Sequence, residues 1–355
     1  MHVLVTGGAG FIGRHVVAAL VAQGHRVRVL DAALPHVYAD RPVPWPEGAE
    51  NIRGDVRDDA AVRDALRGVD AVCHQAAAVG RGNDFADAPL YAGCNDLGTA
   101  VLLKEMQSRG IGRLVMASSV IVYGEGQWRC AEHGAVSPGP RARADLDAGR
   151  FAPRCPRCAA ALTPETVDED GRLDPRNVYG ATKLAQEHLA AAWAAETGAT
   201  ATALRYHHVY GPGMRQDSGY SGVTCTFQSH VRDRVPIDLY EDGAMMRDFV
   251  HVDDVAAANT AALHREGPGF RAYNVASGTP RSVGELARLM SRLGSLPEPR
   301  VSGRYRFDDV RHIVASPARL RAELGWRPTV PFEEGIGAFV REALPEAPPE
   351  ARFPL

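Results

Sequence analysis

A glycine-rich turn near the beginning of the chain constrains the fold more than any other feature of the sequence. It occupies residues 6–13, Thr-Gly-Gly-Ala-Gly-Phe-Ile-Gly, between an apolar run at 2–5 and apolar residues at helical spacing over 11–22. A second apolar run follows at 27–30. Strand, tight turn, helix and strand in this order predict a β-α-β unit.

Glycines at this spacing also have a chemical use. They let the backbone turn tightly and approach a pyrophosphate, whose charge is favoured at the N-terminus of the following helix. The turn therefore predicts a dinucleotide site, with a purely structural turn as the alternative. The predicted cofactor contacts in it are Gly7, Gly10, Phe11, Ile12 and Gly13.

Asp31 ends the second predicted strand, where a carboxylate accepts both ribose hydroxyls of a dinucleotide and repels a 2′-phosphate. NAD is therefore favoured over NADP, although Arg28 and Arg41 lie close in sequence. Residues after the third and fourth strand candidates are either further cofactor contacts or simple packing. They are Asp55, Val56, Ala76 and Ala77.

The rest of the chain continues the alternation of strands and helices. Strand candidates at 71–74, 114–118, 201–206 and 272–275 are separated by helical stretches near 59–66, 95–108 and 179–196. This order predicts an α/β fold, a Rossmann-type doubly wound parallel sheet with helices on both faces. Short strands, proline-rich turns and helical pieces after about residue 211 predict a smaller C-terminal substrate domain.

Composition and charge exclude several classes of protein. The 355 residues are 45% hydrophobic and 23% charged, and no apolar run approaches the roughly 18 residues of a membrane helix. Forty basic against 43 acidic residues give a net charge of −3, so no positive field favours a nucleic acid partner. A strand pattern that begins at His2 leaves no room for a signal peptide. We expect a soluble cytoplasmic protein that binds neither nucleic acid nor membrane.

Tyr179 and Lys183 are candidates for catalysis because an i, i+4 spacing places them on one face of a helix. An adjacent ammonium favours the phenolate form of a tyrosine, which then exchanges a proton with a substrate hydroxyl. The alternative is a solvated amphipathic face, but the chain keeps only one other lysine, Lys104. Ser118 and Ser119 end an apolar strand, where a hydroxyl can bond the reacting oxygen.

Five motifs, in order along the chain, resemble the extended short-chain dehydrogenase/reductases, specifically the nucleotide-sugar epimerase/dehydratase family. They are the glycine turn and residues 117–124, 179–183, 204–212 and 247–255. The resemblance runs from about residue 2 to 342 apart from one insertion. Residues 78–82 and 212–223 are most similar to the branch that contains the deoxythymidine-diphosphate-rhamnose 4-epimerases.

This resemblance implies roles that spacing alone does not assign. It implies that Ser119 is the catalytic hydroxyl and that Asn95 belongs to the cofactor site. Arg247 and Arg311 correspond to arginines that clamp a substrate diphosphate. The residues assigned to a nucleotide-diphosphate sugar are Arg81, Ser119, His208, Arg247 and Arg311. A homodimer through the helices at 95–108 and 179–195 is also implied.

Two departures from the family narrow the expected chemistry. Val120 and Ile121 stand where the 4,6-dehydratases have an Asp-Glu pair, and apolar residues cannot relay a proton. His208 stands where most relatives have an asparagine. We therefore expect a 4-epimerase that acts through a transient 4-keto sugar, with a 4-ketoreductase of deoxysugar biosynthesis as the alternative. A dinucleotide-sensing scaffold without activity is a third possibility, which the retained Tyr179 and Lys183 disfavour.

The insertion carries four metal-ligand candidates in two pairs, each with a two-residue gap: Cys130 with His133, and Cys155 with Cys158. This spacing is typical of a zinc ribbon and predicts one structural zinc. A disulfide between Cys155 and Cys158, or unligated thiols, are the alternatives. The predicted domains are 1–204 plus about 243–276 for NAD, about 127–168 for the zinc-binding module, and 205–242 plus 277–345 for the substrate.

Overall fold

The computed structural model describes residues 1–34, 38, 42–80, 85–214, 222–307 and 309–344. Its centre is a seven-stranded sheet in the order β13-β9-β5-β4-β1-β2-β3, with every neighbouring pair parallel. The strands are β1 (His2–Thr6), β2 (Arg26–Asp31), β3 (Glu50–Arg53), β4 (Ala71–His74), β5 (Arg113–Ser119), β9 (Thr200–Tyr206) and β13 (Gly269–Val275). The predicted doubly wound sheet is confirmed.

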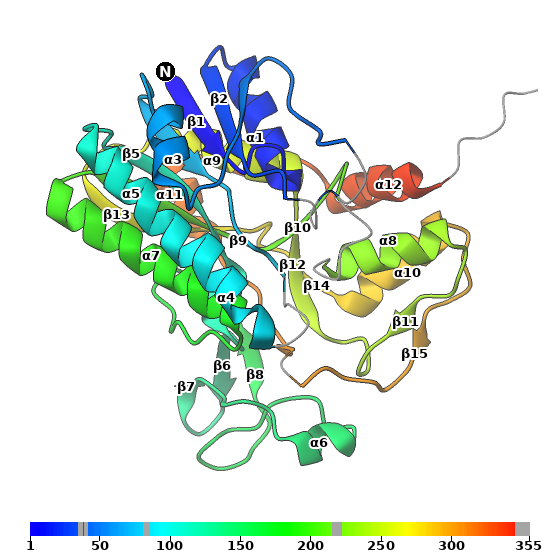
Figure 1. Cartoon of the computed structure of the whole chain (residues 1–355). Coiled ribbons are helices and arrows are strands. Elements are labelled where there is room, and N and C mark those ends of the chain that lie inside the picture. The colour runs from blue at the N-terminus through cyan, green and yellow to red at the C-terminus, as the bar shows by residue number, and fades with distance from the viewer. Residues whose placement is uncertain (35–37, 39–41, 81–84, 215–221, 308, 345–355) are drawn as a thin grey trace, which may run out of the picture.

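Helices cover both faces of this sheet (Figure 1). One face packs on α1 (Phe11–Ala22), α9 (Val252–Leu263) and α11 (Ala318–Leu324). The other packs on α3 (Asp59–Ala65), α5 (Gly98–Ser108) and α7 (Val178–Thr197). All five residues of β1 are buried, as expected for a strand covered on both sides. Among the described residues, no helix combines the length and apolar character needed to cross a membrane.

The helix predicted over 95–108 begins later than its sequence pattern suggests. Before it lie η1 (Phe85–Asp87), α4 (Ala88–Tyr91) and a π-helical turn, η2 (Ala92–Leu97). Gly98 then starts α5 where a Cβ atom would lie 2.7 Å from Val56 Cγ2. The π turn places Asn95 in the interior, where its side chain is fully buried.

A smaller unit lies beside the carboxyl ends of the main sheet (Figure 1). Its core is a three-stranded sheet of β10 (His208–Tyr210), β12 (Met246–His251) and β14 (Pro280–Ser282). Against it pack α8 (Val223–Arg232), α10 (Val283–Leu293) and α12 (Phe332–Ala343), with a short pair of strands, β11 (Asp238–Leu239) and β15 (Arg300–Val301). β12 pairs here, whereas α9 and β13, which follow it, join the main sheet.

The insertion between β5 and α7 forms a separate antiparallel sheet that projects from the body of the molecule (Figure 1). Its strands are β6 (Gln127–Cys130), β7 (Gly134–Val136) and β8 (Thr163–Glu165), with the short helix α6 (Arg143–Asp147) and β6 in the middle. The short helix η3 (Val120–Tyr123) connects β5 of the main sheet to β6 of this sheet. The buried cluster inside it consists of Trp128, Cys130, Val136 and Cys155.

Candidate functional site

The glycine turn joins β1 to α1 and admits no side chain at two of its positions. Gly7 has φ +68°, and a Cβ atom there would lie 2.6 Å from the amide nitrogen of Ala76. A Cβ atom on Gly13 would lie 2.1 Å from the carbonyl oxygen of Gly7. The N-cap residue Gly10 offers no side chain, so the N–H groups of the first helical turn lack a side-chain cap and point out of the helix end.

Asp31 lies beside this turn at the end of β2. Its Oδ2 accepts a hydrogen bond from the Ala9 amide at 3.1 Å and its Oδ1 accepts one from Ala33 at 2.9 Å, which leaves lone pairs on both oxygens. Burial raises the pKa of this carboxyl. Arg28 faces away and donates to the carbonyls of Ala65 and Arg67, whereas Arg41 lies outside the described residues.

The loop after β4 passes directly against the glycine turn. Ala76 donates its N–H to Thr6 Oγ1 at 3.2 Å, and Ala77 follows it in the same loop. Asn95 fixes the next residue, because its Oδ1 accepts from the Ala78 amide at 2.8 Å and its Nδ2 donates to the Ala78 carbonyl at 3.1 Å. The Asn95 side chain therefore fixes the backbone of this loop at Ala78.

Asp55 and Val56 have different surroundings. The carboxylate of Asp55 pairs with Arg57 at 2.6 Å, which lowers the pKa of Asp55, and the Val56 side chain is buried against α5. Both residues therefore keep a packing role in this structure, and their contact with a cofactor stays a prediction.

Ser119, Tyr179 and Lys183 converge from two elements. Ser119 ends β5 and accepts a hydrogen bond from the Ile121 amide at 3.3 Å, and its hydroxyl lies near enough to Tyr179 to act on the pKa of the phenol. Lys183, one turn further along α7, is buried and donates to the Ala117 carbonyl at 2.9 Å. The sequence-predicted catalytic residues are thus together at the carboxyl end of β5.

The expectation that Lys183 would lower the pKa of Tyr179 is wrong for this structure. Desolvation raises the pKa of Tyr179 to about 12 and lowers the pKa of Lys183 to about 7. The lysine Nζ lies 6.0 Å from the centroid of the tyrosine ring and is directed at the Ala117 carbonyl. Spacing on a helix predicts the shared site, but it does not reveal the burial of both groups.

The predicted substrate arginines lie next to each other, because Arg247 Nη1 donates to the Arg311 carbonyl at 3.4 Å, and both contact protein groups. Arg247 is buried and donates to the carbonyls of Met246 at 2.8 Å and Val310 at 2.7 Å, and desolvation lowers its pKa. Arg311 pairs with Glu241 at 2.8 Å and with Asp242 at 2.7 Å.

The remaining substrate candidates are His208 and Arg81. His208 lies at the start of β10, and its ring makes an edge contact with Phe249 at a centroid distance of 5.9 Å. Arg81 lies outside the described residues.

The four predicted metal ligands meet in the inserted module, with their ligand atoms all within 4.8 Å of one another. Cys130 Sγ lies 3.7 Å from Cys158 Sγ and 3.5 Å from His133 Nδ1, and Cys155 Sγ lies 3.6 Å from that nitrogen. All these cysteines are free, so the disulfide alternative is not formed.

A family model described as "NAD dependent epimerase/dehydratase family" matches residues 3–143 and 155–276. The chain belongs to this family. The unmatched stretch between these ranges lies within the inserted module and contains most of α6.

Individual relatives in the family match along nearly the whole chain. A dTDP-L-rhamnose 4-epimerase of Burkholderia thailandensis is 39% identical over 344 residues, which are 94% of this chain and 93% of that protein. A UDP-glucose 4-epimerase of Streptomyces lividans is 30% identical, covering 92% and 91% of the two chains. The solved structure of a Thermus thermophilus UDP-glucose 4-epimerase in complex with NAD has a TM-score of 0.77 and 31% identity, covering 97% of this chain and 99% of that one.

In this member of the family, a buried ion pair joins β9 to α7, the helix that carries Tyr179 and Lys183. Arg205 on β9 donates to both carboxylate oxygens of Glu187 on α7, at 2.9 and 2.7 Å, and to the Tyr123 hydroxyl at 2.7 Å. Glu187 also accepts from Ser118, the neighbour of Ser119. Sequence reasoning missed this pair, although Glu187 follows Lys183 by one helical turn on the same face and therefore carried a usable signal.

Proposed function

We propose that this chain is an NAD-dependent nucleotide-diphosphate-sugar 4-epimerase. The observation that carries the proposal is the meeting of Ser119, Tyr179 and Lys183 at the end of the parallel sheet where the glycine turn also lies. Ligands of such sheets bind outside the carboxyl ends of the strands. The related 4-epimerases of B. thailandensis and S. lividans support the same reaction class.

The residues of the glycine turn fit NAD. The N–H groups at Phe11 and Ile12 are placed for a pyrophosphate, and the free lone pairs of Asp31 for two ribose hydroxyls. Arg28 is committed to backbone carbonyls and so does not offer a partner for a 2′-phosphate, which favours NAD over NADP. When bound, NAD supplies a reversible hydride acceptor. The NAD complex of the T. thermophilus relative supports this assignment.

The protein residues handle the proton. Tyr179 Oη exchanges a proton with the 4-hydroxyl of the sugar, and Ser119 Oγ holds the same oxygen. A pKa of about 12 keeps Tyr179 protonated at neutral pH, which suits proton donation to a 4-keto sugar. The opposite transfer needs a cation to stabilise the phenolate, and Lys183, whose Nζ lies 6.0 Å from the centroid of the Tyr179 ring, would supply it by turning away from the Ala117 carbonyl. Val120 and Ile121 provide no further acid or base.

The diphosphate of the substrate is assigned to Arg247 and Arg311, and His208 keeps its assignment to the substrate from the family resemblance. Arg247 donates hydrogen bonds to backbone carbonyls, whereas Arg311 forms ion pairs with two carboxylates. A diphosphate would compete with these carboxylates for the Arg311 guanidinium. Arg81 keeps its assignment from the family resemblance alone.

The test is turnover without added cofactor or reductant. Purified protein is incubated with dTDP-L-rhamnose and, separately, with UDP-glucose, and the sugars are identified by NMR spectroscopy. We expect an epimer of one of them to accumulate to equilibrium. A parallel incubation of a 4-keto nucleotide sugar with added NADH that consumed one NADH per product, with no epimer formed in the first incubation, would instead identify a 4-ketoreductase. Retained NAD without turnover of any of these sugars would favour the non-catalytic scaffold.

We also propose that Cys130, His133, Cys155 and Cys158 hold one structural zinc ion. Zinc bound tetrahedrally at about 2.3 Å to sulfur and about 2.0–2.1 Å to nitrogen separates two sulfurs by about 3.8 Å and sulfur from nitrogen by about 3.5 Å. The distances of 3.7, 3.5 and 3.6 Å match these edges. Four protein ligands leave no open position, so the ion would stabilise the module without taking part in the reaction.

A homodimer through α5 and α7 is a further proposal. The two helices pack side by side along one face (Figure 1). The exposed residues of α7 include the small side chains of Ala181, Ala192 and Ala195, which would allow the helix of a second copy to approach closely. We expect light scattering at micromolar concentration to give twice the mass of the 38.1 kDa chain, and Ala192→Arg to give monomers. A monomeric parent protein would contradict the proposal.

A further inference from the structure

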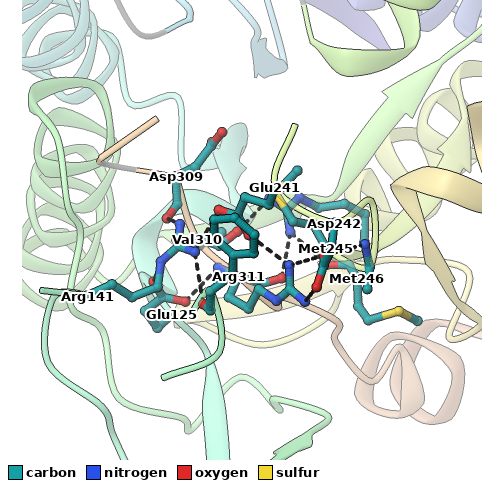
Figure 2. Close-up of polar contacts among 12 residues, drawn as sticks. Glu125, Arg141, Glu241, Asp242, Met245, Met246, Asp309, Val310 and Arg311 are labelled. Carbon is teal, nitrogen blue, oxygen red and sulfur yellow. Dashed lines mark hydrogen bonds and ion pairs between the residues drawn. The ribbon is translucent and has the colours of Figure 1, made fainter. Parts of the chain in front are cut away.

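Arg141 lies in the inserted module but directs its side chain into the wall that carries the substrate arginines. Its side chain is only 2% exposed. It donates to the carbonyl of Phe151 within the module at 3.1 Å, to the carbonyl of Asp309 at 2.6 Å and to Glu241 Oε1 at 2.7 Å (Figure 2). A single side chain thus connects the module to two segments of the smaller unit.

The carboxylate of Glu241 is shared between two arginines. While Oε1 accepts from Arg141, Oε2 accepts from Arg311 at 2.8 Å, and the residue is 1% exposed. A second buried carboxylate, Glu125, accepts from the Arg311 amide at 2.8 Å and lies 3.6 Å from Arg141 Nε. Arg141 and Arg311 are therefore held by the same two acids, one at each end of Arg311.

The base of the module supports the same segment. Trp128 of β6 packs against His312, with ring centroids 5.5 Å apart. Val167 belongs to one buried cluster with Val310 and Ile313. Residues 310–313 therefore lie between the module and β12, so the backbone of Arg311 depends on both.

The contact between Arg311 and Asp242 differs from these buried contacts. Asp242 is 48% exposed and takes two hydrogen bonds from Arg311, each 2.7 Å long. Exposed ion pairs contribute little to stability and exchange easily. Arg311 therefore has a fixed partner in Glu241 and an exchangeable one in Asp242, whose place a phosphate oxygen can take.

We propose that Arg141 is a positioning residue for Arg311, through which the inserted module sets the affinity for the nucleotide diphosphate. The proposal rests on the proposed function, because only that assigns Arg311 to the diphosphate. Arg141 neutralises one oxygen of Glu241 and fixes its rotamer. Without Arg141, the whole charge of Glu241 faces Arg311, and the carbonyls of Phe151 and Asp309 lose a donor.

The first experiment compares Arg141→Met with the parent protein. Calorimetry with dTDP and with UDP measures diphosphate affinity, and steady-state kinetics separate KM from kcat. We expect Kd and KM to rise by about tenfold or more while kcat stays within about twofold, since misplacing a binding group costs affinity and Tyr179 is untouched. Arg129→Met, at an exposed position of the same module, is the control and should change neither quantity.

Two further variants separate positioning from a general loss of structure. Arg141→Met combined with Arg311→Met should bind no more weakly than Arg311→Met alone, because both act through one contact. Asp242→Asn should bind dTDP or UDP a few-fold more tightly, since it removes the charge that competes with phosphate.

The outcomes also separate this proposal from the proposed function. If the parent protein binds neither dTDP nor UDP, the proposed function fails. If it binds one of them and Arg141→Met binds equally well, the positioning role is wrong. Should Arg141→Met fail to fold, Arg141→Lys keeps a positive charge near Glu241 but not the planar guanidinium that makes the three contacts, and unchanged affinity of this variant for dTDP and UDP would overturn the positioning role.

Discussion

Tyr179→Phe is expected to lower kcat by about 10²–10⁴-fold while the melting temperature and the amount of bound NAD stay unchanged. The substitution removes only the phenolic oxygen, which lies near Ser119. The ring remains to pack against Tyr91, with a centroid distance of 6.0 Å. Proton exchange with the 4-hydroxyl therefore stops, whereas the cofactor turn at Gly7–Gly13 is unaffected. Epimerisation rates and the NAD released on denaturation are the measurements.

Tyr91→Phe is the matched control because it removes the same atom from the neighbouring ring. Its hydroxyl donates to the Val79 carbonyl at 3.3 Å, so we expect a loss of about 1 kcal/mol in unfolding free energy and a kcat within a few-fold of the parent. If Tyr179→Phe also stayed within a few-fold of the parent, Tyr179 would not be the proton-transfer residue.

The sequence predicts the sheet and the meeting of Tyr179 and Lys183 because their signals are local. Buried parallel strands appear as short apolar runs, and the helix period alone brings Tyr179 and Lys183 to one face. The four metal-ligand candidates are also found by local spacing, and the structure brings them within reach of one ion.

The protonation states and the arginine network depend on contacts that are distant in sequence. Glu241 lies 100 residues after Arg141, and no periodic pattern relates them. The raised pKa of Tyr179 follows from burial that several elements create together, and it reverses the direction that the neighbouring lysine suggests. Asn95 is likewise predicted from the family resemblance to belong to the cofactor site, and in the structure its side-chain amide forms hydrogen bonds with the backbone of Ala78.

Cys155→Ser is expected to abolish zinc binding and to loosen residues 127–168. The buried cluster of the module contains only four residues, two of which are metal-ligand candidates, so it has little apolar area to stabilise it. Structural zinc contributes about 10–16 kcal/mol of binding free energy in small zinc-binding peptides, and losing a ligand forfeits much of it. Metal analysis should fall from about one zinc per chain to near zero, and limited proteolysis should cut within the module.

The effect of Cys155→Ser on kinetics shows whether the zinc site of the inserted module supports substrate binding. Arg141 and Phe151 lie in the loosened module, so the contacts to Glu241 and Asp309 would be lost together with the metal. KM for the nucleotide sugar should then rise by about tenfold or more, as for Arg141→Met, while NAD stays bound because Gly7–Gly13 follows β1, which β4 separates from β5 in the sheet. Cys94→Ser, a buried cysteine outside the metal-ligand group, should keep both zinc and KM. If protein purified without chelator contains no zinc, the zinc site is wrong. If Cys155→Ser has unchanged kinetics, the module does not support substrate binding.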